Sequence, residues 1–179
     1  MNKSDEPAKT GTVEQEQIKL RLPTAADGPF LHKLVADSPP LDPNSIYCNL
    51  LQCSHFAGTA VAAELSEQLV GFVSGYRIPD RPDTYFLWQV VVAEAGRGCG
   101  LAKRMIVEIL SRPELADITH LETTITPDNE ASWALFRSFA RDQGAELESQ
   151  VHFERDTHFH GQHDDEHLLR IGPFSINSK

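Results

Sequence analysis

Apolar residues recur along this chain with two different periods, and the two periods predict which segments form strands and which form helices. Polar and apolar side chains alternate between residues 18 and 22, as in a strand, whereas Leu31, Leu34 and Val35 have the spacing of a helical stripe. The expected strands are 18–22, 59–65, 69–76, 84–92, 120–125, 145–153 and 168–171, and the expected helices are 25–36, 46–54, 101–112 and 129–143. This order predicts an α/β fold in which helices cover both faces of a mixed sheet.

Capping residues and turns mark the ends of these elements. Thr24 and Ser45 suit helix N-caps, because a side-chain hydroxyl accepts a bond from an amide of the first turn. Gly144 is placed to end the last helix. Residues 66–68 are expected to close a hairpin, and three prolines between residues 39 and 43 predict a stiff loop that no helix crosses.

The segment from Trp88 to Ala102 has the order strand, glycine-rich loop and helix start, which predicts a receptacle for phosphate. The first amides of a helix lack partners within the helix, and the helix dipole adds partial positive charge there. Glycine lets the backbone approach an anion closely, and Arg97 adds a charge-assisted donor. The sequence lacks the G-x-G-x-x-G fingerprint of dinucleotide sites and the G-x-x-x-x-G-K-[ST] loop of nucleotide sites. An ordinary turn from strand to helix is the alternative interpretation.

Composition limits the classes of protein to which the chain can belong. With 179 residues, 40% of them hydrophobic, it is long enough for one domain with a sizeable core. The net charge of −10 argues against a nucleic-acid partner, whose phosphates require a basic surface. No apolar run approaches the roughly 20 residues of a membrane span. Residues 1–17 are polar, lack the apolar core of a secretory signal, and are expected to be a disordered tail. Three cysteines, a sparse and odd set, fit a reducing cytoplasm.

Two motifs resemble the GNAT superfamily of N-acetyltransferases. The pattern R-x-x-G-x-A at residues 97–102 is similar to the superfamily's loop for the diphosphate of acetyl-CoA, and N-x-x-S-x-x-L-F at residues 129–136 is similar to its N-x-x-A-x-x-L-Y helix. The resemblance implies the acyl-CoA N-acyltransferase fold, with a central mixed, mostly antiparallel twisted sheet, and acetyl-CoA as co-substrate. Phe136 departs from the pattern. Many of these enzymes use the tyrosine at that place to protonate the departing CoA thiolate, and a phenyl ring has no proton to give.

The same resemblance implies where the cofactor is held. The residues expected to bind it are Val90, Val91, Val92, Arg97, Gly98, Cys99, Gly100, Leu101, Ala102 and Asn129. Backbone amides of the valine strand would polarise the thioester carbonyl, and amides of residues 97–102 would hold the diphosphate. Asn129 would lie near the pantetheine or the thiol. Cys99 is interpreted as a small filler, because its place in the loop faces phosphate and not the thioester.

Further segments narrow the resemblance to the diaminobutyrate acetyltransferases of ectoine biosynthesis, a family within that superfamily. They are residues 38–45, 55–56, 71–77, 82–84, 88–90, 121–129 and 169–172. The resemblance covers residues 18–174, expected to form one GNAT domain between the tails 1–17 and 175–179. It implies transfer of acetyl from acetyl-CoA to the γ-amine of L-2,4-diaminobutyrate, on the way to ectoine, a compatible solute of osmotic stress. It also implies a cytoplasmic homodimer, and no membrane partner is expected.

A substrate with two ammonium groups and one carboxylate requires acidic side chains in its site. The candidate residues on the substrate side, grouped here as catalytic, are Asp42, Glu166, Trp88, Tyr47 and His163. Asp42, in the proline loop, and Glu166, in the C-terminal loop, are expected to grip the amino groups. Trp88 is expected to pack against the alkyl chain or an ammonium, with Tyr47 and His163 completing the pocket. The carboxylate partner stays open between backbone amides and Arg77, and the choice of base also stays open.

Three alternative interpretations accompany this hypothesis. The histidines between residues 152 and 167 are potential ligands for Zn²⁺ or Ni²⁺, but their spacing fits no closed structural site and acetyl transfer needs no metal, so no metal is predicted. Another GNAT enzyme would act on a polyamine, an aminoglycoside or a protein lysine. A catalytically silent acyl-CoA-binding sensor belongs to a different functional class, and the phenylalanine at position 136 favours it slightly. Release of thiol with diaminobutyrate would exclude the sensor.

Overall fold

Seven strands form one sheet in the part of the chain that the computed structural model describes, which is residues 18–39, 41 and 43–176. Their order across the sheet is β1-β2-β3-β4-β5-β7-β6, and each neighbouring pair is antiparallel except β4 and β5. The strands are β1 Lys19–Arg21, β2 Val61–Leu65, β3 Gln68–Ile78, β4 Arg81–Val92, β5 His120–Ile125, β6 Glu146–Phe153 and β7 Glu166–Gly172. The helices are α1 Gly28–Ala36, α2 Ile46–Cys53, α3 Leu101–Leu110 and α4 Glu130–Gln143, with short 3-10 turns η1 Ala25–Asp27, η2 Ala57–Thr59, η3 Glu94–Gly96 and η4 Pro113–Leu115.

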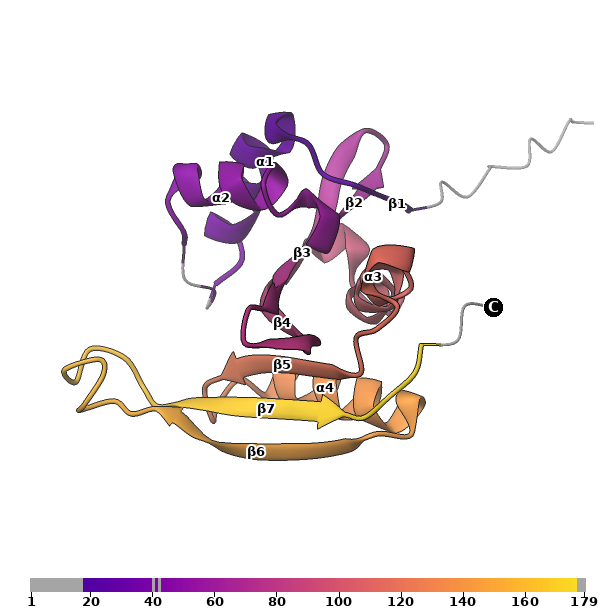
Figure 1. The fold of residues 1–179 in the computed structure, drawn as a ribbon. Coiled ribbons are helices and arrows are strands. Elements are labelled where there is room, and N and C mark those ends of the chain that lie inside the picture. The colour runs from indigo at the N-terminus through magenta and orange to yellow at the C-terminus, as the bar shows by residue number, and fades with distance from the viewer. Residues whose placement is uncertain (1–17, 40, 42, 177–179) are drawn as a thin grey trace, which may run out of the picture.

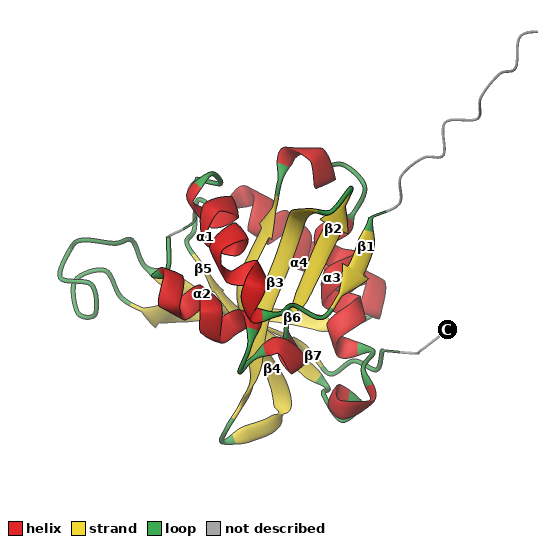
Figure 2. Cartoon of the chain, turned by 90° about the horizontal axis from the view of Figure 1, so that it is seen from above, coloured by secondary structure: helices red, strands yellow, loops and turns green. Residues whose placement is uncertain are grey.

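Helices lie on both faces of this sheet. Helices α1 and α2 lie on one side of β3 and α3 lies on the other, while α4 runs beside β5, β7 and β6 (Figure 1). Seen from above, α1 and α2 stand in front of the sheet (Figure 2). The expected order of elements and the mixed, mostly antiparallel sheet are therefore confirmed. None of the helices in the described ranges is long and apolar enough to cross a bilayer.

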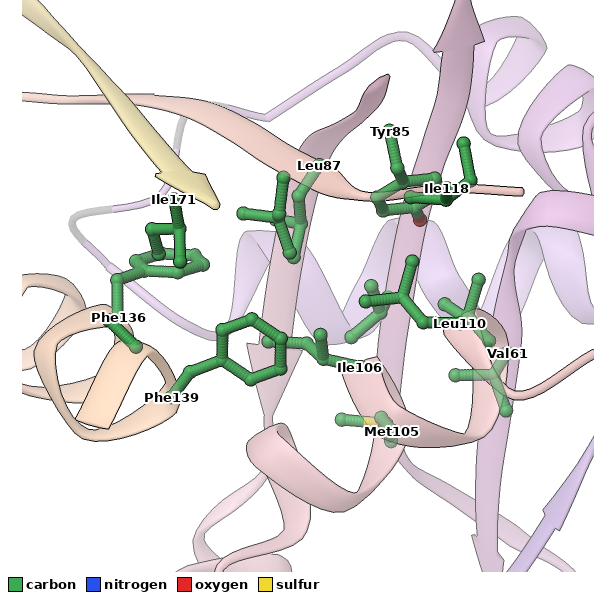
Figure 3. Close-up of a cluster of buried hydrophobic side chains, with 14 of the residues drawn as sticks. Val61, Tyr85, Leu87, Met105, Ile106, Leu110, Ile118, Phe136, Phe139 and Ile171 are labelled. Carbon is green, nitrogen blue, oxygen red and sulfur yellow. The ribbon is translucent and has the colours of Figure 1, made fainter. Parts of the chain in front are cut away.

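The larger core fills the space between the sheet and helices α3 and α4 (Figure 3). Met105 and Ile106 of α3 and Phe139 of α4 are fully buried there. Tyr85 of β4 is buried as well, and its hydroxyl donates to the backbone carbonyl of Thr59 at 2.8 Å, so its polar atom is paired. A smaller cluster of apolar side chains packs beneath α1 and α2 on the opposite face.

The predicted caps Ser45 and Gly144 explain where α2 begins and where α4 ends, and Asn129 caps the start of α4. Ser45 Oγ accepts a bond from the Cys48 amide at 3.1 Å, and Asn129 Oδ1 accepts one from the Ser132 amide at 3.1 Å. Gly144 has a φ of 62°, a left-handed conformation that is costly for residues with a Cβ. Ser45 and Gly144 thus confirm the helix ends that the sequence indicates, whereas α4 begins at Glu130, one residue after its cap.

One boundary differs from the sequence prediction in a way that matters for the site. The last strand begins at Glu166 and not at residue 168, because Glu166 pairs with Phe153 across the hairpin of β6 and β7. Glu166 therefore lies at the start of a strand instead of in the C-terminal loop. At the other end, Phe174 is buried in the larger core and Ile176 packs against it.

Strands β4 and β5 pair over only three residues and then separate. The pairing runs from Thr84 to Phe86 of β4 and ends opposite Glu122 of β5. The Glu122 side chain is 2% exposed and bonds to two guanidinium groups, those of Arg81 and Arg170. This ion cluster marks the vertex from which the two strands diverge.

Beyond the vertex, β4 carries a bulge. Gly75 of β3 is opposite Leu87, whereas the preceding Ser74 is opposite Gln89, so Trp88 is the extra residue. A bulge bends the strand and redirects the side chains that follow it. It therefore turns this part of β4 away from the regular ladder at the place where β5 has left.

Candidate active site

A cavity of about 590 Å³ lies where β4 and β5 separate. Residues 87–90 of β4, residues 123–126 at the end of β5, the first turns of α4 and parts of the segment 155–166 line it. Small-molecule sites occupy roughly 300 to 1,000 Å³, so the cavity suits a compact substrate together with one end of a cofactor. Because the strands part here, both turn an edge toward the cavity and not toward each other.

Three of the predicted substrate-side residues lie on this cavity: Trp88, His163 and Glu166. The Trp88 ring is partly exposed and meets the Tyr76 ring edge-on, with 6.5 Å between centroids, which fixes its orientation. The Glu166 side chain is 18% exposed and its Oε2 atom is buried. The structure thus brings an indole face and a carboxylate to one small volume.

His163 presents a defined nitrogen toward Glu166. Its Nδ1 lies 2.8 Å from the carbonyl oxygen of Asp164, and its Nε2 lies 3.8 Å from Glu166 Oε1. A carbonyl oxygen only accepts, so Nδ1 carries the hydrogen and the neutral ring keeps its lone pair on Nε2. This arrangement gives His163 and Glu166 the chemistry of a base at the cavity wall.

The charges around the cavity favour a cationic ligand. Among the described residues that line it, three carry carboxylates and one carries a guanidinium: Asp128, Asp164, Glu166 and Arg155. Arg155 Nη1 lies 3.1 Å from Asp164 Oδ1, so one of the acids is paired by the chain itself. The remaining negative charge attracts ammonium groups.

The other predicted substrate-side residues are placed differently. Asp42 lies outside the described residues. Tyr47, in α2, is 68% exposed and does not line the cavity. Arg77, one of two options for a carboxylate partner, binds the Asp117 carboxylate at 2.8 Å and also does not line the cavity, so the structure does not place it near a substrate there. Its partner lies forty residues away in sequence, which is why the pattern alone did not reveal it.

Two cavity residues were missed by the sequence reasoning. Asn44 Nδ2 donates to Gln89 Oε1 at 3.1 Å, and both side chains line the cavity. The bond connects the proline loop to β4 immediately after the bulge. A polar residue directly following Trp88 in an otherwise apolar strand was the available signal.

The glycine loop forms a second hollow, of about 320 Å³, at the start of α3. Among the predicted cofactor residues, Val92, Arg97, Gly98, Gly100, Leu101 and Ala102 line it. Gly98 and Gly100 have φ values of 78° and 70°, and an added Cβ at either would meet no heavy atom within 4 Å. The glycines are therefore required by backbone conformation. The Arg97 amide, one of those expected to face the anion, donates to the Glu94 carbonyl at 3.1 Å.

The remaining predicted cofactor residues divide between the two sites. Val90 lines the larger cavity, whereas the Val91 side chain packs into the cluster beneath α1 and α2. Cys99 is exposed and its thiol donates to the Gly96 carbonyl at 3.3 Å. Asn129 lines the larger cavity, with its Oδ1 atom capping α4. The valine strand thus runs from one hollow to the other.

The part of the chain that the structure describes contains no group of three or more His, Cys, Asp and Glu side chains that could hold a metal ion. The histidines of the C-terminal segment instead contact neighbouring rings: His158 lies against Phe153, and His163 lies against Phe159.

Comparison with known proteins gives a consistent assignment. The Acetyltransferase (GNAT) family matches residues 29–140. The L-2,4-diaminobutyric acid acetyltransferase of Methylotuvimicrobium alcaliphilum is 57% identical over 157 residues, which are 88% of this chain and 91% of that protein. The enzyme of the same name from Halomonas elongata is 49% identical, over 92% of this chain and 85% of its own length. Among solved structures, the diaminobutyrate acetyltransferase EctA from Paenibacillus lautus, in complex with L-2,4-diaminobutyric acid and coenzyme A, superposes with a TM-score of 0.85 at 34% identity, covering 92% of this chain and 98% of that one.

Proposed function

This chain belongs to the GNAT acetyltransferase family, and we propose that it transfers the acetyl group of acetyl-CoA to the γ-amine of L-2,4-diaminobutyrate. It is an acyltransferase that depends on acetyl-CoA. The observation that supports this choice of substrate is the similarity, along nearly the whole chain, to an enzyme whose structure was solved in complex with diaminobutyrate and coenzyme A. The product would supply the ring closure that yields ectoine.

The reaction requires a neutral amine beside the thioester. A free alkyl amine has a pKa of about 10.4, like lysine, so the attacking nitrogen must lose a proton to a base in the cavity. Glu166 and His163, 3.8 Å apart, are the candidate bases among the described residues. The amine lone pair then forms the C–N bond, the nitrogen gives up its second proton to solvent, and the C–S bond breaks with its electron pair leaving on sulfur. Amides of β4 next to the cavity would stabilise the oxyanion, as oxyanion-hole donors do.

The substrate site is proposed from charge and shape. Asp42 and Glu166 hold the two amino groups, and Trp88 packs against the short alkyl chain. The acidic lining of the cavity and the partly exposed Trp88 ring support this assignment. In this proposal His163 completes the pocket at the cavity wall, and Tyr47 contributes from α2, outside the cavity lining. The residues of the cofactor site keep the roles that the family resemblance implies, with the diphosphate at the glycine loop.

We also propose that the protein is a cytoplasmic homodimer that does not bind nucleic acid or membranes. The resemblance to diaminobutyrate acetyltransferases supports the dimer, and the net charge of −10 disfavours contact with phosphate backbones. Light scattering on the purified protein tests the assembly, because a mass of one chain would contradict it.

Turnover with purified protein tests the function. Thiol release from acetyl-CoA should require diaminobutyrate and be much slower with a polyamine, an aminoglycoside or a lysine peptide, and NMR of the product should place the acetyl group on the γ-nitrogen. The substrate site is tested separately with Asp42→Ala and Glu166→Ala. If both variants keep kcat/KM for the diamine within about threefold of wild type, the assigned site is wrong.

A further inference from the structure

The first turns of α4 present an unused hydroxyl to the cavity. Ser132 lines the cavity, and its amide is occupied by the Asn129 cap. Within the described ranges, its side-chain hydroxyl has no hydrogen-bond partner. The hydroxyl of Thr123, another lining residue, is already used, since it donates to the Leu87 carbonyl at 3.0 Å. Ser132 is therefore a donor that the fold itself leaves available.

The side chain one turn after Ser132, that of Phe136, has no polar atom. Phe136 lies four positions after Ser132, on the same face of α4, and its ring is 1% exposed where it meets the cavity. In the helix pattern that this segment resembles, alanine and tyrosine stand where this chain has serine and phenylalanine. The hydroxyl has thus moved by one turn along the helix and has not been lost.

A cofactor held at the glycine loop would reach Ser132 along a continuous wall. The smaller hollow is bounded by Val92 of β4 and Leu135 of α4, and the larger cavity is bounded by Val90 of the same strand and Phe136 of the same helix. A chain that starts with its diphosphate at the loop and follows β4 therefore passes between this strand and α4. Its far end arrives at the first turns of α4, where Ser132 lies.

We propose that the Ser132 hydroxyl donates a hydrogen bond to the sulfur of coenzyme A as the C–S bond breaks. This inference rests on the acetyl-CoA dependence of the proposed function. The electron pair of the breaking bond stays on sulfur, and the amine proton goes to the cavity base. A thiol has a pKa of about 8.5, so the thiolate needs stabilisation more than immediate protonation. The positive end of the α4 dipole acts in the same direction, and the thiolate takes its proton from solvent as the product leaves.

The variant Ser132→Ala tests this role without endangering the fold. Alanine is the best helix former, and the wild-type hydroxyl makes no bond to the residues that the structure describes. We expect kcat to fall about 10- to 100-fold, the range for a hydrogen bond to a charged group, while affinity for coenzyme A changes little. The matched control is Ser111→Ala, which removes a serine hydroxyl bonded to the Val107 carbonyl in α3, away from the cavity, and should leave kcat unchanged.

A spectroscopic measurement separates stabilisation of the thiolate from a structural role. The ultraviolet absorbance of the thiolate, followed during a pH titration of the complex with coenzyme A, gives the pKa of the bound thiol. We expect the pKa of the bound thiol to be higher in Ser132→Ala than in wild type, and Asp128, which also lines the cavity, is present in both proteins. An equal thiol pKa in the two proteins overturns the inference, whatever happens to kcat. Because the titration uses no diaminobutyrate, a wild type that fails to acetylate it would refute the proposed substrate and leave this result standing.

Discussion

Replacing Glu122 by glutamine should destabilise the sheet at the vertex where β4 and β5 separate. The carboxylate is 2% exposed and is bonded to Arg81 through Oε2 at 2.7 Å and to Arg170 Nη1 through Oε1 at 2.5 Å. Glutamine keeps the volume of the side chain but removes the charge. The variant would leave two guanidinium groups facing each other around a neutral amide.

The expected loss follows from the burial of the three groups. Breaking a buried ion pair costs about 3–5 kcal/mol, and the lower end applies here because both arginine side chains keep contact with water, at 45% and 30% exposure. A loss of about 3 kcal/mol lowers the melting temperature by about 6–12 °C in a domain of this size. The control Asp37→Asn breaks the exposed pair with Lys33 and should cost less than about 0.5 kcal/mol.

The pH dependence of the same variant checks the mechanism. Burial alone would raise the pKa of Glu122, but the bonds from Arg81 and Arg170 outweigh it and hold this pKa below its ordinary value of 4.5. A group with a depressed pKa stabilises the folded state above its unfolded pKa, and this stabilisation is lost as the pH falls through the folded pKa. Urea denaturation of wild type and Glu122→Gln should therefore show the full difference at pH 7 and a shrinking one below about pH 4. A difference under about 1 kcal/mol at pH 7, or one that persists unchanged into acid, would refute this reasoning.

Three further predictions concern positions around the site. Asn44→Ala removes the bond to Gln89 and should raise KM for diaminobutyrate about fivefold in steady-state assays, which corresponds to the free energy of one hydrogen bond. The melting temperature should stay unchanged. An unaltered KM would contradict a positioning role for Asn44. Gly100→Ala places a Cβ at a φ of 70° and should lower the free energy of unfolding, measured by denaturation, by about 1–2 kcal/mol. The same variant should bind coenzyme A more weakly in calorimetry. An affinity equal to that of wild type would count against the loop as the diphosphate site. Tyr85→Phe leaves the Thr59 carbonyl without its donor and should cost about 1–2 kcal/mol in thermal unfolding, whereas a neutral effect would show that water replaces the hydroxyl.

The order of elements was predictable because local chemistry decides it. Ser45, Asn129 and Gly144 each act within a few residues of their own position, so their helix ends could be inferred from spacing. The glycine loop was likewise recognisable, since the strand before it and the helix after it are continuous in sequence. Its two left-handed glycines have a local cause as well.

The arrangement of the substrate side was not predictable in the same way, because it depends on contacts between distant segments. Pairing with Phe153 draws Glu166 into a strand, and Asp117 takes the guanidinium of Arg77. The bond from Asn44 to Gln89 spans 45 residues and joins a loop to a strand. No periodicity or motif in the sequence indicates such pairings. The partners of charged and polar side chains that lie far apart in the chain were therefore the least predictable part of the site.

The parallel pairing of β4 and β5 explains why the two halves of the site meet. Parallel strands end at the same edge of a sheet, so the segments that follow β4 and β5 both start there. Each of those segments leads into a helix, α3 after the glycine loop and α4 after Asn129, and both helices direct their N-termini toward that edge. A helix N-terminus stabilises negative charge. A thioester cofactor carries negative charge in two places: on the diphosphate at all times, and on the sulfur when the C–S bond breaks. In the proposed arrangement this topology provides one helix for each, and the separation of the strands beyond Glu122 leaves room for the amine between them.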